Sequence, residues 1–143
     1  MTDCKGVKQY EIDAVYYSGS GLFYLRSQDD ACILLARGYS GFGAGRDDPA
    51  QEAEKSYGPI PAGIWKVEPF RDHVRLGPIA APLIPVGHNA HGRTVFYIHG
   101  DNKWGNCTAS TGCIVLPRSA RECLRALNVR VLEVRPYVGQ FGV

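Results

Sequence analysis

A histidine and a cysteine, each at one end of an apolar run, are the residues of this chain with the clearest chemical meaning. His99 follows the run 94–98, and Cys113 opens the run 113–116 fourteen positions later. A nearby base favours the thiolate form of cysteine, and imidazole suits that task because its pKa lies near neutrality. If the two runs are neighbouring strands, the pattern predicts nucleophilic catalysis by Cys113 with His99 as its base. The backbone carbonyl of Gly100 is the candidate to orient the histidine, since no Asp or Asn is obvious for that role.

The residues just before Cys113 suit the same chemistry. Gly112 has no side chain at the point where a substrate carbonyl must come close. Successive backbone N–H groups of Thr111, Gly112 and Cys113 are expected to form an oxyanion hole, in which one donor is worth roughly 3–4 kcal/mol. Ser110 is expected to hold the shape of this loop through a hydrogen bond.

Short apolar runs separated by turns are expected to position the pair. Seventeen Gly and nine Pro punctuate the chain, which is typical of a mainly β protein. The segment 58–63 (GPIPAG) is a rigid turn, and the prolines at 78, 82 and 85 are expected to break the apolar stretch 74–86 into pieces. Loops are expected at 38–49 and 50–57. Strands are expected at 22–26, 31–36, 64–67, 94–98, 113–116 and 129–134.

One helix is predicted, directly after the run that Cys113 opens. The segment 117–127 carries apolar residues at the i, i+3, i+4, i+7 spacing of a helix face: Ala120, Cys123, Leu124 and Leu127. Three arginines fall off this stripe and are expected to face solvent: Arg118, Arg121 and Arg125. Together the elements predict a single mainly β domain over residues 1–143, with one principal helix after the catalytic strand.

Length and composition favour a single domain and argue against several classes of function. The 143 residues suit one domain that buries its own core. The net charge is only +2, and the basic residues are scattered along the chain. Both observations argue against a nucleic-acid partner. No apolar run reaches the ~20 residues of a membrane helix. The stretch 1–17 lacks the apolar segment of a Sec signal peptide, so we expect a protein made in the cytoplasm and exported by another route.

The catalytic residues lie in a pattern that resembles a known family. His-Gly at 99–100, a loop, and Ser-x-Gly-Cys-Ile at 110–114 resemble the motif of L,D-transpeptidases of the YkuD type. Upstream, Ser-Gly at 40–41, the 58–63 turn and the stretch 92–100 look like one branch of it, which includes antibacterial effectors delivered by type VI secretion. The resemblance covers about 20–135 and implies a sandwich-like β fold. Thr111 and Val115 depart from the cell-wall-building members, which favours the effector branch.

The resemblance implies a reaction and partners. Cys113 would attack the carbonyl on the L-centre of the third residue of a peptidoglycan tetrapeptide stem, and the terminal D-Ala would leave. Water, a D-amino acid or a second stem peptide would resolve the thioester, and no cofactor is needed. The expected partners are stem peptides, a cognate immunity protein and a component of the secretion system, with the target cell's periplasm as the site of action.

Arg93, Lys103 and Arg118 are candidates to meet stem-peptide carboxylates, although any one of them is more often a solvated surface charge. Trp104 either contacts substrate or anchors its own loop.

Other interpretations remain open. The chain is alternatively a Cys-His amidase or peptidase on another peptide, or a non-catalytic module that binds the cell wall. His88 and His91 form H-x-x-H, a weak zinc signal, and a loop that lines the cleft is the preferred interpretation, so no metal is expected. The Gly-rich stretch 38–45 lacks the Gly-Lys-Ser/Thr end of a phosphate loop and is expected to form a tight turn or a cleft wall.

The five cysteines include at least one without an intramolecular partner, because their number is odd. Cys32 and Cys123 lie in apolar patterns and are expected in the core. Cys107 lies in the loop between the catalytic residues and is a candidate to pair with Cys113 on oxidation. Cys4 is expected to be a terminal thiol.

Overall fold

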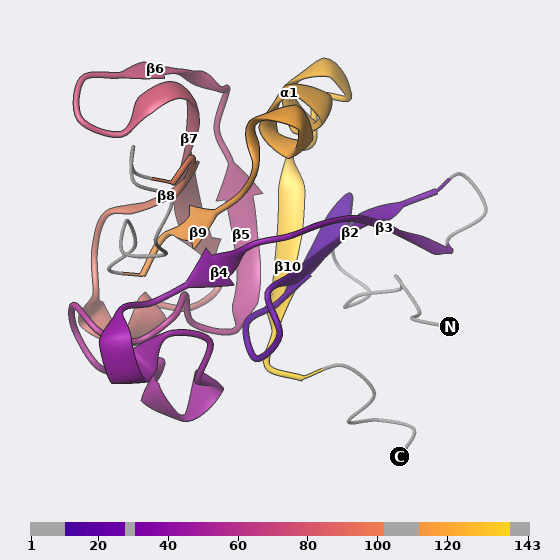
Figure 1. The fold of residues 1–143 in the computed structure, drawn as a ribbon. Coiled ribbons are helices and arrows are strands. Elements are labelled where there is room, and N and C mark those ends of the chain that lie inside the picture. Colours follow the sequence, from indigo (N-terminus) through magenta and orange to yellow (C-terminus); the bar gives the residue numbers. More distant parts are fainter. Residues whose placement is uncertain (1–10, 28–30, 102–111, 138–143) are drawn as a thin grey trace.

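A mixed β-sheet dominates the fold, as Figure 1 shows. The computed structural model describes residues 11–27, 31–101 and 112–137. Its strands are β1 (Ala14–Tyr17), β2 (Leu22–Arg26), β3 (Cys32–Arg37), β4 (Tyr39–Ser40), β5 (Gly63–Val67), β6 (Arg71–His73), β7 (Gly77–Val86), β8 (Phe96–His99), β9 (Ile114–Val115) and β10 (Val131–Arg135). Short 3-10 turns cover Gly43–Gly45, Pro49–Gln51 and Ala90–Gly92, and the α-helix α1 covers Arg118–Ala126. The predicted mainly β class and the single principal helix are confirmed within the described residues.

The order of the strands shows that the sheet is rolled. The order is β3-β2-β1-β10-β5-β7-β8-β9-β4, with β6 paired to β7. β3 and β4 stand at opposite ends of this order, yet only Gly38 separates them in the chain, so the two ends of the sheet must meet there (Figure 1). A Cβ added at Gly38 would collide with the carbonyl oxygen of Val115 in β9, which explains the glycine at this junction.

The rolled sheet encloses one main core. Its largest fully buried side chains include Trp65, Ile98, Ile114 and Leu124. The Trp65 indole packs edge-on against Phe96 with ring centroids 4.9 Å apart. The core therefore fixes β8, which ends at His99, and β9, which directly follows Cys113.

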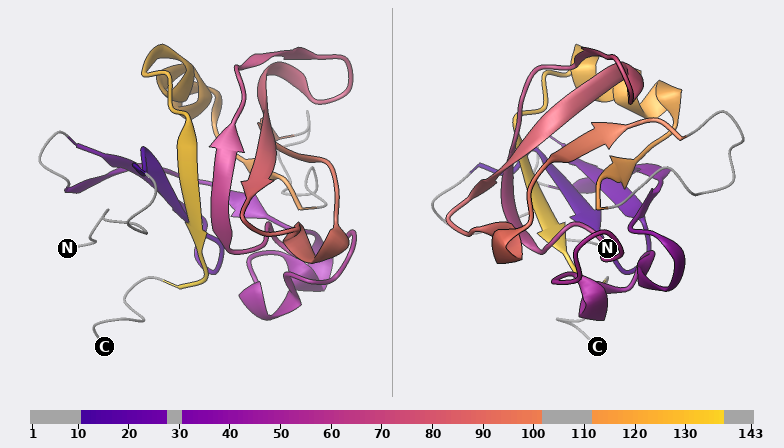
Figure 2. Two further views of the ribbon diagram at one scale, coloured as in Figure 1. Left: turned by 180° about the vertical axis from the view of Figure 1, so that it is seen from behind. Right: turned by 90° about the vertical axis from the view of Figure 1, so that its left-hand side faces the viewer.

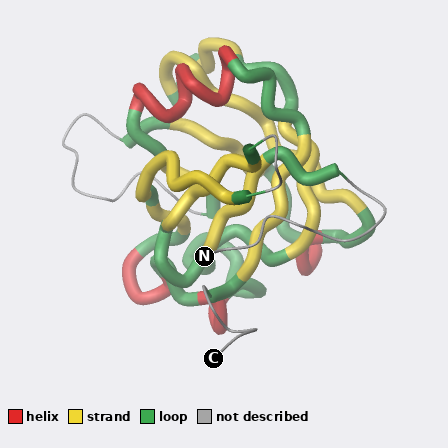
Figure 3. Tube along the Cα trace, turned by 90° about the vertical axis from the view of Figure 1, so that its right-hand side faces the viewer, coloured by secondary structure: helices red, strands yellow, loops and turns green. Residues whose placement is uncertain are grey.

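The helix packs at one end of the molecule, and the 3-10 turns lie at the other (Figures 2 and 3). Ala120 and Leu124 are buried beneath α1, as the apolar spacing predicted. Arg121 was predicted on the solvated face, and that prediction was wrong, because only 7% of it is exposed. Its guanidinium donates to the carbonyl oxygens of Leu116, Pro78 and Ile79, so it fastens α1 to β7.

The stretch 74–86 also differs from its prediction. β7 runs unbroken over Gly77–Val86 and contains all three prolines. The strand changes neighbours along its length: β6 pairs with its first part, β8 with its middle and β5 with its last part. Prolines are tolerated where a strand has a partner on one side only, and this arrangement provides such positions.

Several smaller predictions were corrected as well. The region 38–49, expected to be loop, contains β4, while β1 and β6 were not predicted at all. Cys32 is half-buried and disulfide-bonded, and Cys123 is a partly buried thiol, so neither belongs to the buried core. Cys4 and Cys107 lie outside the described residues. Within the described ranges, no helix is long and apolar enough to cross a membrane.

Candidate active site

His99 ends β8 and is held in one orientation. Its Nδ1 donates to the carbonyl oxygen of Gly100 at 2.7 Å, as predicted. Because a carbonyl only accepts hydrogen bonds, the proton of the neutral ring lies on Nδ1. The other ring nitrogen, Nε2, is buried and has no hydrogen-bond partner in the described part of the chain. Nε2 is therefore the ring atom that can accept a proton.

Cys113 directly precedes β9, which runs parallel to β8. The register places Ile98 beside Ile114 and His99 beside Val115. Through this pairing the cysteine and the histidine reach the same pocket, which has a volume of about 530 Å³. The predicted neighbourhood of the two strands is therefore present, and the thiol and the imidazole line one cavity.

Burial keeps both groups uncharged. It raises the pKa of the Cys113 thiol from 9.0 to about 11, against the opposing effects of a hydrogen bond from the Tyr97 backbone and the positive charge of Arg93. Burial also lowers the pKa of His99, although the Gly100 hydrogen bond opposes this. At neutral pH the resting pair is consequently a thiol and a neutral imidazole. A nucleophile at Cys113 would therefore have to form by proton transfer to a base, because no thiolate is stored beforehand.

Ser40 holds the backbone in front of Cys113. It lies in β4, which pairs with β9 and places Ser40 opposite Ile114. Its hydroxyl donates to the carbonyl oxygen of Gly112 at 3.2 Å and accepts from the backbone N–H of Ile60 at 2.8 Å. The sequence singled out Ser-Gly at 40–41 only through the family resemblance. The structure gives this serine a contact on each side, one to the 58–63 turn and one to the residue before the nucleophile.

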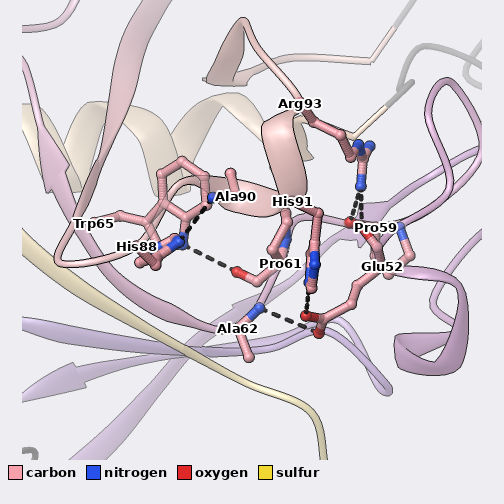
Figure 4. A network of polar contacts seen from close by, with 9 residues as sticks. All are labelled: Glu52, Pro59, Pro61, Ala62, Trp65, His88, Ala90, His91 and Arg93. Atoms are coloured by element: carbon pink, nitrogen blue, oxygen red, sulfur yellow. Dashed lines mark hydrogen bonds and ion pairs between the residues drawn. The ribbon is translucent and has the colours of Figure 1, made fainter.

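Arg93 lines the same pocket as His99 and Cys113. Only 8% of Arg93 is exposed, and its guanidinium donates to the carbonyl oxygen of Gly58 at 3.0 Å. A second bond goes to the carbonyl oxygen of Pro59 at 2.8 Å (Figure 4). The guanidinium also donates to the carbonyl oxygen of Glu52. Arg93 was expected either to meet a substrate carboxylate or to be a solvated surface charge. In the structure the guanidinium contacts backbone carbonyls and the residue is buried, so it is not a solvated surface charge. Its contact with a substrate carboxylate stays a prediction.

The remaining predicted contacts fall elsewhere. Arg118 is exposed, pairs with Glu122 on α1 and lines a second hollow, of about 550 Å³, that contains neither His99 nor Cys113. The other predicted site residues lie outside the described residues: Lys103, Trp104, Ser110 and Thr111. The oxyanion hole, which depends on Thr111, therefore stays a prediction.

The two histidines of the H-x-x-H pattern have structural partners. His88 Nε2 donates to the carbonyl oxygen of Ile64 at 3.0 Å. The His88 ring packs edge-on against Trp65 (Figure 4). His91 Nε2 lies 2.7 Å from a carboxylate oxygen of Glu52. Neither histidine lines the pocket of Cys113. Among the described residues, no group of three or more His, Cys, Asp or Glu side chains is arranged to hold a metal ion.

Sequence reasoning missed most of the pocket wall. The wall includes Lys55, Arg75 and His73, together with Val95 and Tyr97. None of the described lining residues is acidic, so the charged side chains that line the cavity around Cys113 are basic. These residues come from separate turns and strands, and no local motif marks them.

Comparison with known proteins adds one finding. A family model described as the Tlde1 domain matches residues 35–137, a range that includes β4, His99 and Cys113. No curated protein gave a significant match to the chain.

Proposed function

We propose, from the premise that this chain belongs to the Tlde1 domain family of type VI secretion effectors of the L,D-transpeptidase type, that it is a cysteine-dependent L,D-transpeptidase or L,D-carboxypeptidase of peptidoglycan. Its substrate would be the tetrapeptide stem. One observation carries the proposal: His99 is fixed through Nδ1 with a buried Nε2, and His99 and Cys113 line the same pocket.

The first half-reaction follows from the protonation states. As the stem peptide enters, the proton of the Cys113 thiol moves to His99 Nε2, and the sulfur attacks the carbonyl carbon of the third residue. The tetrahedral intermediate collapses when the C–N bond to D-Ala breaks. The imidazolium gives its proton to the leaving amine, which restores neutral His99 and leaves a thioester on Cys113.

The second half-reaction runs through the same base. His99 Nε2 takes a proton from the acceptor, which then attacks the thioester carbonyl. The C–S bond breaks, and the sulfur leaves as the thiol with the proton from His99. Water gives a tripeptide, a D-amino acid gives an exchanged stem, and an amine of a second stem gives a cross-link.

The charge of the pocket supports an anionic peptide substrate. Lys55, Arg75 and Arg93 line it, and no Asp or Glu does so among the described residues. A stem peptide carries several carboxylates, which a positive cavity attracts. Biologically, we propose delivery by a type VI secretion carrier, action in the periplasm of a target bacterium and a cognate immunity protein.

The test is mass spectrometry of tetrapeptide muropeptides incubated with the protein, with and without D-methionine. Native protein should remove D-Ala or replace it with D-methionine, and Cys113→Ala should do neither. Cys123→Ala is the matched control, because it removes a partly buried thiol from α1 and should keep activity. If folded native protein leaves every muropeptide unchanged, or if Cys113→Ala remains active, the proposal is wrong.

A further inference from the structure

We propose that Arg93 is a positioning residue of this active site: it holds the Gly112–Cys113 backbone in place and keeps a permanent positive charge facing the Cys113 sulfur. The role of Cys113 as nucleophile rests on the function proposed above. The contacts of Arg93 stand independently of it.

The guanidinium lies directly against the residue before the nucleophile. Gly112 has a φ of +131°, a conformation that suits glycine, and a Cβ added there would collide with Nη2 of Arg93. The ring of Phe96 lies on another side, with the guanidinium carbon 5.2 Å from its centroid. Arg93 is therefore packed between the start of β8 and the backbone that leads into β9.

A rigid frame fixes the direction of the guanidinium. Its nitrogens donate to the carbonyl oxygens of Gly58 and Pro59, which belong to the proline-rich turn. Glu52 ties this frame together, because its carbonyl oxygen accepts from Arg93 while its carboxylate accepts from the Ala62 N–H at 3.3 Å and contacts His91 at 2.7 Å (Figure 4). A planar fork with this many acceptors has one preferred orientation.

The charge that this frame holds is permanent. Burial lowers the pKa of Arg93, yet a guanidinium remains protonated in proteins, so the charge persists at every pH at which the enzyme works. Burial raises the pKa of the Cys113 thiol, and the charge of Arg93 opposes that rise. Each time the thiol gives its proton to His99, the charge is already in place to stabilise the thiolate.

The experiment measures the thiol itself, so it does not depend on the substrate. Native protein, Arg93→Gln and Arg93→Met are treated with iodoacetamide between pH 7 and 9.5, and modification of the Cys113 peptide is followed by mass spectrometry. Only the thiolate reacts, so a rise of about one unit in the thiol pKa slows modification at fixed pH about tenfold. We expect that loss in both neutral variants. Arg93→Met, which keeps an apolar stem against Phe96, carries the test if Arg93→Gln does not fold.

Three control variants separate charge from packing. Ser40→Ala loosens Gly112 without removing a charge, so it should keep the native rate or react faster. Arg118→Gln removes an exposed arginine that lies away from the pocket and should match native protein. Arg93→Lys keeps the charge but loses the fork, so it should modify faster than Arg93→Gln.

Two outcomes would overturn the proposal. One is a neutral Arg93 variant that folds, as judged by circular dichroism, and is modified at the native rate throughout the pH range. The other is a rise in KM for muropeptides with unchanged kcat and unchanged modification, which would make Arg93 a substrate ligand. If no muropeptide is turned over, the function proposal fails while the modification rates still decide the role of Arg93.

Discussion

Removing the Ser40 hydroxyl should lower the free energy of unfolding by an amount that shows how strongly this residue holds the backbone beside Cys113. Ser40 is fully buried, and its Oγ joins the N–H of Ile60 to the carbonyl oxygen of Gly112. Ser40→Ala deletes this oxygen and leaves the surrounding side chains unchanged. The substitution therefore acts on two backbone groups, one in the proline-rich turn and one beside Cys113.

The expected loss follows from these two bonds. The Ile60 N–H, on a residue with 0% exposure, loses an acceptor at 2.8 Å and stays buried, which costs about 1–3 kcal/mol. The 3.2 Å bond to the Gly112 carbonyl oxygen is longer and contributes about 0.5–1 kcal/mol. The free energy of unfolding should fall by about 1.5–4 kcal/mol in total.

Urea denaturation followed by tryptophan fluorescence measures this loss. Ser18→Ala is the matched control, because Ser18 is equally buried but its hydroxyl makes only a 3.4 Å bond to the Arg135 carbonyl oxygen in the described structure. That control should lose less than about 1 kcal/mol. Equal losses in the two variants would refute the reasoning. The Ser40 variant should also lose turnover, since Gly112 is no longer held.

Two further predictions concern buried ionisable groups, the Cys113 thiol and the Arg121 guanidinium. The Cys113 thiol has a pKa of about 11 in the folded protein and of about 9.0 in the unfolded chain, so the free energy of unfolding should fall as pH rises between these values, by roughly 3 kcal/mol at most. Urea titrations of Cys113→Ala should lack this part of the alkaline loss. An identical dependence on pH in both proteins would contradict the assigned pKa. Arg121→Met should lower the free energy of unfolding by about 3–5 kcal/mol, because three carbonyl oxygens lose their donor. The control Arg125→Met, on the exposed face of α1, should change it by less than about 0.5 kcal/mol. Similar losses in the two variants would contradict the role of Arg121.

Local patterns in the sequence predicted the elements that depend on local rules. The 117–127 helix was placed correctly to within a residue at each end, because its apolar spacing and its proline are local signals. The sequence could not reveal that Arg121 is buried, since that depends on carbonyl groups in β7 more than forty residues away. β7 itself was misread because proline was taken as a strand breaker, whereas the neighbours of this strand change along its length.

The active site divides in the same way. His99, Gly100 and Cys113 were proposed as site residues because their chemistry is visible in short motifs, and of that proposal the Gly100 hydrogen bond is confirmed. The residues that support them act across long separations. Ser40 reaches Gly112 across 72 positions, and Arg93 reaches Pro59 across 34. Residue types alone do not encode such contacts, which exist only once the sheet has rolled up.

The protonated state of Cys113 has a consequence beyond catalysis. Cys32 is disulfide-bonded, whereas Cys113 is a thiol, so this chain holds both oxidation states. Disulfide exchange and oxidation require a thiolate. A thiol with a pKa of about 11 holds roughly one part in ten thousand as thiolate at pH 7, and it is only 8% exposed. Burial therefore protects the sulfur from oxidation. Under the proposed function it also delays nucleophile formation until His99 takes the proton, so the local base and the fixed charge of Arg93 would be needed because the resting thiol is inert.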